Sequence, residues 1–301
     1  MPNFTKLSTE NLTEILPFFK SKPKFALFYN AAKFQLENRL PSHPSDFYVF
    51  EAKETKYFYV FRHDNIPDNY RPILMIGNEG VIEERDVIQG LEEISKMEPN
   101  LKNIDLLLAK DQLAYAAQKF YISHFNLSSD FTISNHNFYL SPEVSPEVQA
   151  KIEGYSIPEG FSIGSTKMSD AIFVNDSWKF GTPDTILQTR ELIQRLPTAC
   201  ITHKNQPVSF EMIGLHGQLC HQYTYPEYRN RGFGALVENT IISKCISEGM
   251  QVVKSVEREN KIVLKRSMAH PWWQIVRDDD GEPIVYDCVE YHLDKQKSEI
   301  E

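Results

Sequence analysis

A glycine-rich turn between a predicted strand and a predicted helix carries the clearest chemical signal in this sequence. The strand is expected to begin near Gly217, and the turn has Arg229, Gly232 and Gly234 in the order R-x-x-G-x-G. Glycine lacks a Cβ, so the backbone there can approach a ligand closely. A helix that begins at the turn directs its unpaired N–H groups and positive dipole end toward that ligand. The pattern therefore predicts a cradle for a pyrophosphate.

The residues around the turn distinguish two classes of cofactor. A dinucleotide fingerprint has the order G-x-G-x-x-G, and its first glycine is absent here because Arg229 takes an early position. An R-x-x-G-x-G turn instead resembles the acyl-CoA loop of the GNAT acyltransferase superfamily. Over residues 168–267 the chain resembles the glycine N-acyltransferases in particular, while the N-terminal half matches that family only in length and position. The matching blocks are Val174-Asn175, Trp178, Phe180-Gly181, Pro197-Thr198, Pro207-Val208, Thr224 and Pro226-Glu227-Tyr228-Arg229.

This resemblance implies an acyl-CoA-dependent N-acyltransferase, with acyl-CoA as co-substrate and no metal. The acyl group would pass to the amine of glycine or a similar small amino acid by direct attack on the thioester. Two alternatives remain open: an acetyl-CoA-dependent acetyltransferase acting on another small amine, and a catalytically weak acyl-CoA-binding protein. The residues expected to hold the cofactor are Thr224, Tyr225, Arg229, Arg231, Gly232, Phe233, Gly234, Ala235 and Asn260.

The base that deprotonates the attacking ammonium is the point at which the sequence departs from the family. The family has a glutamate nine residues before the position of Glu227, and that place is taken here by Gln218, which is neutral. On a regular strand His216 would share the face of Gln218, and an ordinary histidine has a suitable pKa. Glu211 on the preceding strand is a second substitute, and a route through ordered water is a third. His221 has the opposite parity and would face the same side only if the strand bulges.

The residue that protonates the departing thiolate also differs. Some GNAT enzymes use a tyrosine, and the matching position holds Met268, beside Ser267. A thiol with a pKa of about 8.5 can leave without an acid at neutral pH, so this loss costs less than the loss of the base. The candidate catalytic residues are therefore His216, Gln218 and Glu211.

Composition limits the classes of partner. The formal charge is −9, whereas a nucleic-acid-binding surface normally needs a basic excess, so no nucleic-acid partner is expected. No apolar run approaches 18 residues, so no membrane span is predicted. The expected partner is a small-molecule acyl acceptor, and the oligomeric state stays open. The four cysteines, which lie far apart and form no C-x-x-C pair, argue against a zinc site or a disulfide scaffold; they are Cys200, Cys220, Cys245 and Cys288.

The N-terminus gives no clear address. It lacks the pattern of a signal peptide and, because Glu10 and Glu14 come early, the acid-poor character of a transit peptide. The resemblance implies a mitochondrial location, and a cytoplasmic one is equally compatible with the residues.

The length of 301 residues fits two domains of about 150 residues each. We expect an α/β (α+β) protein with two GNAT-like domains, each a mixed, mainly antiparallel sheet flanked by helices. The tandem Ser-Pro-Glu-Val units at 141–148 predict a linker with turns, so the boundary is placed at residue 145. Residues 1–145 would form a degenerate domain without a cofactor, because they contain no R-x-x-G-x-G, and residues 146–301 the catalytic domain.

Hydrophobic periodicity and turn signals predict the elements that position these residues. In the first half they are helices at 8–20, 24–39, 86–97 and 112–122 and strands at 47–51, 56–62, 73–76, 104–109 and 131–140. In the second half they are strands at 160–164, 198–203, 207–215, from 217, 251–256, 273–277 and 284–293, and helices at 169–178, 182–195, from the glycine turn to 248, and 260–269. The last strand is expected to close the sheet of the second half.

Overall fold

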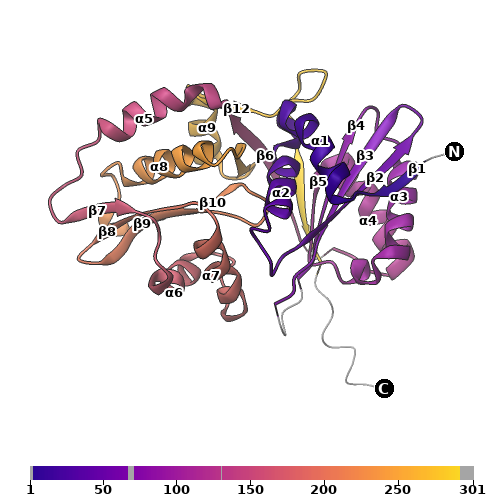
Figure 1. The fold of residues 1–301 in the computed structure, drawn as a ribbon, viewed down its shortest axis with the longest axis horizontal. Coiled ribbons are helices and arrows are strands. Elements are labelled where there is room, and N and C mark those ends of the chain that lie inside the picture. The colour runs from indigo at the N-terminus through magenta and orange to yellow at the C-terminus, as the bar shows by residue number, and fades with distance from the viewer. Residues whose placement is uncertain (1–2, 67–70, 130, 292–301) are drawn as a thin grey trace.

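A single mixed sheet runs through the whole molecule, and helices flank both of its faces (Figure 1). The structure is a computed structural model that describes residues 3–66, 71–129 and 131–291. Within these residues the strand order is β1-β2-β3-β4-β5-β13-β6-β11-β10-β9-β8-β7, and β12 also pairs with β6. The β4/β5 and β10/β11 pairs are parallel and the other pairs are antiparallel. The predicted class, a mixed and mainly antiparallel sheet flanked by helices, is confirmed.

The first half contributes one end of this sheet. Helices α3 and α4 cover one face, and α1 and α2 cover the other, each pair with its own apolar core. The elements are β1 Asn3–Lys6, α1 Thr9–Ser21, α2 Ala26–Leu36, β2 Ser45–Ala52, β3 Thr55–Arg62, β4 Ile73–Glu79, α3 Glu84–Met97, β5 Leu106–Lys110, α4 Asp111–Phe125 and β6 Phe131–Leu140.

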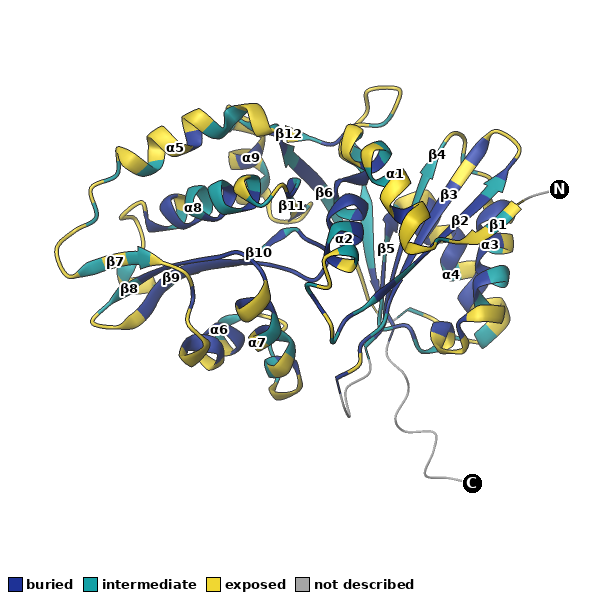
Figure 2. Cartoon of the chain, in the orientation of Figure 1, coloured by how far each residue is buried: buried dark blue, intermediate teal, exposed yellow. Residues whose placement is uncertain are grey.

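The second half contributes the other end. Helices α5, α8 and α9 lie on one face and α6 and α7 on the other, and strands β8 and β9 between them are largely buried (Figure 2). The elements are α5 Ser145–Glu153, β7 Phe161–Gly164, α6 Ala171–Ser177, α7 Ile186–Arg195, β8 Thr198–His203, β9 Gln206–Ile213, β10 Leu219–Thr224, α8 Phe233–Ser247, β11 Val252–Glu257, α9 Lys261–Ala269, β12 Trp273–Ile275 and β13 Tyr286–Glu290.

The two halves share strands where they meet. The prediction that residues 284–293 close the sheet of the second half is wrong for the described part of that segment, because β13 lies between β5 and β6. Val289, in the middle of β13, is fully buried opposite Leu107 in the core formed with α3 and α4. Burial of this apolar side chain in the first-half core accounts for the placement. Strand β6 in turn pairs with β11. The domain boundary at residue 145 remains a prediction.

The segment at 141–148, which was predicted to be a linker with turns, contains the start of a helix. A short 3-10 turn covers Pro142–Val144, and helix α5 begins at Ser145. Pro146 lies in its first turn, where the missing N–H costs nothing, and Glu147 lies at the positive end of the helix dipole. The second Ser-Pro-Glu is therefore a helix start. No helix in the described ranges is both long and apolar enough to cross a membrane.

Candidate functional site

Strands β10 and β11 meet at only one position and then separate. Their parallel pairing consists of Leu219 with Lys254, whereas β10 stays paired with β9 as far as Thr224. The edge of β10 that follows Leu219 therefore has no neighbouring strand on the β11 side in the described structure. A gap of this kind leaves backbone N–H and C=O groups available for an extended ligand.

Strand β10 also contains a bulge. Cys220 pairs with Met212 and Tyr223 with Phe210, so two residues of β10 face one residue of β9. His221, the first residue of the bulge, has a positive φ of 52°. A bulge of this kind re-aims side chains relative to regular alternation.

The turn that follows β10 has the predicted form. A 3-10 turn covers Pro226–Tyr228, and the backbone then takes left-handed conformations at Asn230 (φ 61°) and Gly232 (φ 77°) before α8 begins. The first backbone hydrogen bond of α8 runs from Leu236 N to the Gly232 carbonyl, at 3.1 Å. The N–H groups of residues 232–235 therefore precede the helical ladder, as at any helix start. A Cβ on Gly234 would approach only Gln222 Oε1 and Thr224 Oγ1, at 3.7 and 3.9 Å.

The two arginines of the turn hold its backbone and stay exposed. Arg229 Nε donates to the Thr224 carbonyl at 2.9 Å, which ties the turn to the end of β10. Arg231 Nη2 donates to the Glu227 carbonyl at 3.2 Å, and its guanidinium lies 5.5 Å from the ring centre of Tyr228. Both cations therefore lie beside the start of α8, where they reinforce the positive end of its dipole.

Of the other predicted cofactor residues, two sit on β10 or directly after it. Thr224 Oγ1 shares a hydrogen bond of 2.7 Å with Ser209 Oγ, and Tyr225 N donates to the Val208 carbonyl at 3.0 Å. Asn260 precedes α9, and its side chain accepts a hydrogen bond from Val263 N at 3.2 Å, which makes it the N-cap.

A cavity of about 590 Å³ lies across the central strands, between the two halves. Its floor includes side chains of β11 and β13, and its walls come from α2 on one side and from residues 178–192 on the other. Most of the lining is apolar, as in typical small-molecule sites. From β10 and the turn before it, the lining includes His216, Gln218, Leu219, Cys220 and His221.

Two of the predicted catalytic residues lie in a turn rather than on a strand. Residues 214–218 close the hairpin between β9 and β10, so the parity argument for His216 and Gln218 does not apply, although both line the cavity. His216 is 4% exposed, and its Nδ1 has no hydrogen-bond partner in the described residues. Burial, followed by the neighbouring Arg62 and His43, holds its pKa well below the usual range. Gln218 Oε1 is also without a partner among these residues.

Glu211, the third predicted catalytic residue, points toward α8 instead. It is 4% exposed and accepts a hydrogen bond of 3.0 Å from Gln222 Nε2, which also donates to the Gly234 carbonyl at 3.2 Å. Burial, followed by the charge of Glu238 on α8, raises the pKa of Glu211 well above its usual value.

His221 lines the same cavity as Gln218, although regular alternation along a strand would place it on the opposite face. It lines the cavity where β10 has left β11, stacks with Trp178 at 5.8 Å and meets Phe210 edge-on at 5.3 Å. Its Nε2 lies 3.2 Å from Ser177 Oγ. Burial lowers the pKa of His221 to about 4. The sequence signal for this placement was conditional on a bulge, and the bulge is present.

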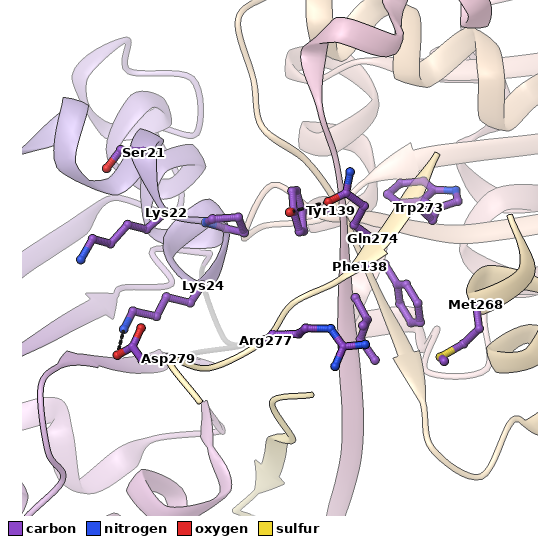
Figure 3. A pocket seen from close by; sticks show the side chains of 12 residues that line it. Ser21, Lys22, Lys24, Phe138, Tyr139, Met268, Trp273, Gln274, Arg277 and Asp279 are labelled. Carbon is purple, nitrogen blue, oxygen red and sulfur yellow. Dashed lines mark hydrogen bonds and ion pairs between the residues drawn. The ribbon is translucent and has the colours of Figure 1, made fainter. Parts of the chain in front are cut away.

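Met268, at the position of the family's tyrosine, lines a second cavity (Figure 3). This cavity has a volume of about 580 Å³ and lies beside β12 and the segment between α1 and α2. Trp273 and three cations, Lys22, Lys24 and Arg277, also line it. Lys24 pairs with Asp279 at 3.4 Å and with Glu79 at 3.0 Å, and Lys22 also pairs with Glu79. Most of this basic charge is thus already balanced by the chain.

One group of side chains has metal-ligand geometry. Asp46, His63 and Glu98 place their ligand atoms within 4.8 Å of one another. Lys6 Nζ lies 2.8 Å from Asp46 and 3.3 Å from Glu98, so an ammonium already pairs with both carboxylates. The donor set therefore fits an internal ion-pair cluster, and it lies outside the residues predicted to act in chemistry.

Comparison with known proteins supports the fold. No family model matches the chain. A Drosophila protein of known structure aligns over 96% of this chain and 98% of its own with a TM-score of 0.72 and 16% identity, which shows a shared fold over nearly the whole length. A GCN5-related N-acetyltransferase from Kribbella flavida aligns over 88% of this chain and 95% of its own, with a TM-score of 0.48 and 12% identity. A GCN5-related N-acetyltransferase-like protein from Streptococcus suis aligns over 94% of this chain and 99% of its own, with a TM-score of 0.47 and 12% identity.

Proposed function

We propose that this protein is an acyl-CoA-dependent N-acyltransferase that acylates the amine of glycine or a similar small amino acid. The observation that carries the proposal is the separation of β10 from β11 directly ahead of the left-handed glycine turn at the start of α8. One extended ligand can use both features, because a pyrophosphate suits the turn and a pantetheine arm suits the open strand edge.

All the predicted cofactor residues except Asn260, which caps α9, have a place in this scheme. The N–H groups of residues 231–235 bind the pyrophosphate, and Arg229 and Arg231 add positive charge beside it. The backbone around Thr224 and Tyr225 bonds the pantetheine. The thioester then lies next to the cavity of about 590 Å³, whose size and apolar lining suit an acyl group larger than acetyl.

The reaction needs no covalent intermediate on the protein. The amine nitrogen attacks the thioester carbonyl carbon, the C–N bond forms, and the C–S bond breaks with its electron pair going to the CoA sulfur. The proton of the amine goes to a base or to ordered water, and the thiolate leaves without an acid because its pKa is low enough. His216 and Glu211 are candidate bases, while Gln218 can only orient the acceptor, because an amide does not take the proton.

A second candidate is a catalytically weak acyl-CoA-binding protein. It is favoured by Gln218 and Met268, which stand where the family has its glutamate and tyrosine. Both readings require CoA to bind at the glycine turn, and they differ only in whether an amine accelerates thiol release.

Two measurements test the proposal. Thiol release from a panel of acyl-CoAs, with and without glycine and other small amines, separates the transferase from the binder. Calorimetry with CoA then tests the predicted pyrophosphate cradle with the variant Arg231→Glu. Arg231 is exposed, and a glutamate there would repel the pyrophosphate but interact favourably with the dipole of α8.

The matched control is Arg85→Glu, which makes the same charge change at an exposed position in the first turn of α3. We expect the dissociation constant for CoA to rise about tenfold or more in Arg231→Glu, and more steeply at low salt, with little change in the control. Absence of CoA binding to the unaltered protein, or equal effects of the two substitutions, would refute the cradle.

A further inference from the structure

We infer that His221 is the catalytic residue that accepts the proton from the attacking amine. This inference rests on the proposed acyl transfer and assigns a group for one of its steps. The starting observation is the bulge in β10, which gives His221 a φ of 52° and places it against the cavity instead of on the face expected from alternation.

The position of His221 along β10 suits the reaction. The last contact between β10 and β11 is at Leu219, so His221 stands two residues into the separated part of the strand. Under the proposed function the thioester arrives through this gap, and the acceptor occupies the adjoining cavity. A base must come within hydrogen-bond reach of the amine, and His221 lines the cavity that the acceptor would occupy.

The surroundings hold the imidazole in one orientation. The ring stacks on Trp178 with an interplanar angle of 28° and meets the edge of Phe210 at 89°. These two contacts, from the segment after α6 and from β9, restrain the ring on two sides. His221 is therefore positioned before any ligand binds, which is what a base needs to act without reorganisation.

A hydrogen-bond relay specifies the tautomer. The hydroxyl of Ser177 donates to the Val174 carbonyl at 2.9 Å, so its proton is already used. We therefore assign the 3.2 Å contact between Ser177 Oγ and His221 Nε2 as a donation from the ring, which puts the ring hydrogen on Nε2. With the ring hydrogen on Nε2, Nδ1 keeps its lone pair. Ser177 is thus a positioning residue, and Nδ1 is the atom that takes the proton.

The ring is neutral at physiological pH, as a proton acceptor must be. The groups packed against it are Ser177 from α6, Trp178 from the segment after α6 and Phe210 from β9, and none of them is charged. Lys179, next to Trp178, pairs with Glu257 on β11. Cys220, adjacent in the chain, remains a thiol because burial raises its pKa to about 12.

The other candidates are less well placed for this step. Glu211 is directed to α8 and held by Gln222, away from the cavity. His216 lines the cavity from the tip of the hairpin turn, but it precedes the point where β10 leaves β11, and its Nδ1 is buried. Among the histidines of the described chain that line this cavity, His221 alone lies in the separated part of β10.

The assignment is tested with His221→Gln, which can keep a donor toward Ser177 but cannot take a proton. His124→Gln, the same exchange at an exposed position of α4, is the control. We expect kcat for amine-dependent thiol release to fall about 100-fold or more in His221→Gln, with an unchanged dissociation constant for CoA and an unchanged melting temperature, and no loss in the control. The acidic limb of the pH–rate profile should also disappear.

Nitrogen-15 NMR of the imidazoles gives a readout that is independent of activity. The intact protein should show His221 protonated at Nε2, and Ser177→Ala should weaken that preference while lowering kcat. His221 in the Nδ1–H tautomer, or an unchanged kcat in a folded His221→Gln variant, would overturn the assignment and leave the proposed function intact. Absence of amine-dependent release from the unaltered protein, with CoA still bound, would overturn both.

Discussion

The hairpin turn that leads into the site depends on one glycine, and replacing it provides a quantitative test. Gly217 has a φ of 80°, and an added Cβ would lie 2.3 Å from the Cβ of Asn30 on α2. Asn30 is fully buried and donates to the carbonyls of Gly217 and Gln251, at 2.9 and 2.7 Å, while it accepts from Gln251 N at 2.9 Å. This side chain therefore fastens the turn and the entry to β11 onto the first half.

The expected cost of Gly217→Ala has two parts. A left-handed conformation costs a residue with a Cβ about 1–2 kcal/mol. A Cβ–Cβ distance of 2.3 Å cannot persist, so α2 and the turn must separate and strain or lose the three hydrogen bonds of Asn30, each worth about 1 kcal/mol. The free energy of unfolding should fall by about 3–5 kcal/mol, which is a large share of the total for a typical domain.

Gly281→Ala isolates the first part. Gly281 has a φ of 84°, but nothing lies within 4 Å of an added Cβ, so only the backbone cost of about 1–2 kcal/mol applies. Urea unfolding of the two variants and the unaltered protein measures both values. If Gly217→Ala destabilises no more than Gly281→Ala, the close approach of Asn30 to the turn is refuted.

Two further predictions concern buried titratable groups. Burial raises the folded-state pKa of Glu211, so its contribution to stability is fully present below the unfolded-state pKa and is lost as pH rises through the folded-state pKa. In urea unfolding, Glu211→Gln, which still accepts from Gln222, should therefore gain stability relative to the unaltered protein at pH 8 compared with pH 4. An equal difference in stability at the two pH values would contradict this prediction. Burial raises the pKa of Cys200, Cys220 and Cys288 to about 12 and that of Cys245 further. The thiols of the folded protein should therefore react with an aromatic disulfide at pH 8 far more slowly than the same thiols in urea. Rapid reaction of the folded protein would show that the cavity is open to the reagent.

The form of the glycine turn could be predicted because its determinants are local. The left-handed backbone of Gly232 and the helix that follows it depend on neighbours in the sequence. The insertion of β13 between β5 and β6 and the pairing of β6 with β11 could not be predicted in this way. The alternation of residues 286–290 indicates a strand, but the strand's neighbours are decided by which core buries Val289, and that depends on contacts far away in the chain.

The bulge at His221 shows where parity arguments fail in general. Regular alternation along β10 places His221 away from Gln218, and a single unpaired residue reverses the assignment for every position beyond it. The residue types at 220–223 do not indicate a bulge, because the aromatic and β-branched residues at 223–225 are equally typical of a regular strand. What favours it in the structure are groups from other elements: Ser177 and Trp178 bind the imidazole on one side, and Phe210 contacts it on another. If these contacts are the cause, Ser177→Ala and Trp178→Ala should shift the amide resonances of residues 220–223, whereas a bulge fixed by β9 alone would leave those resonances in place.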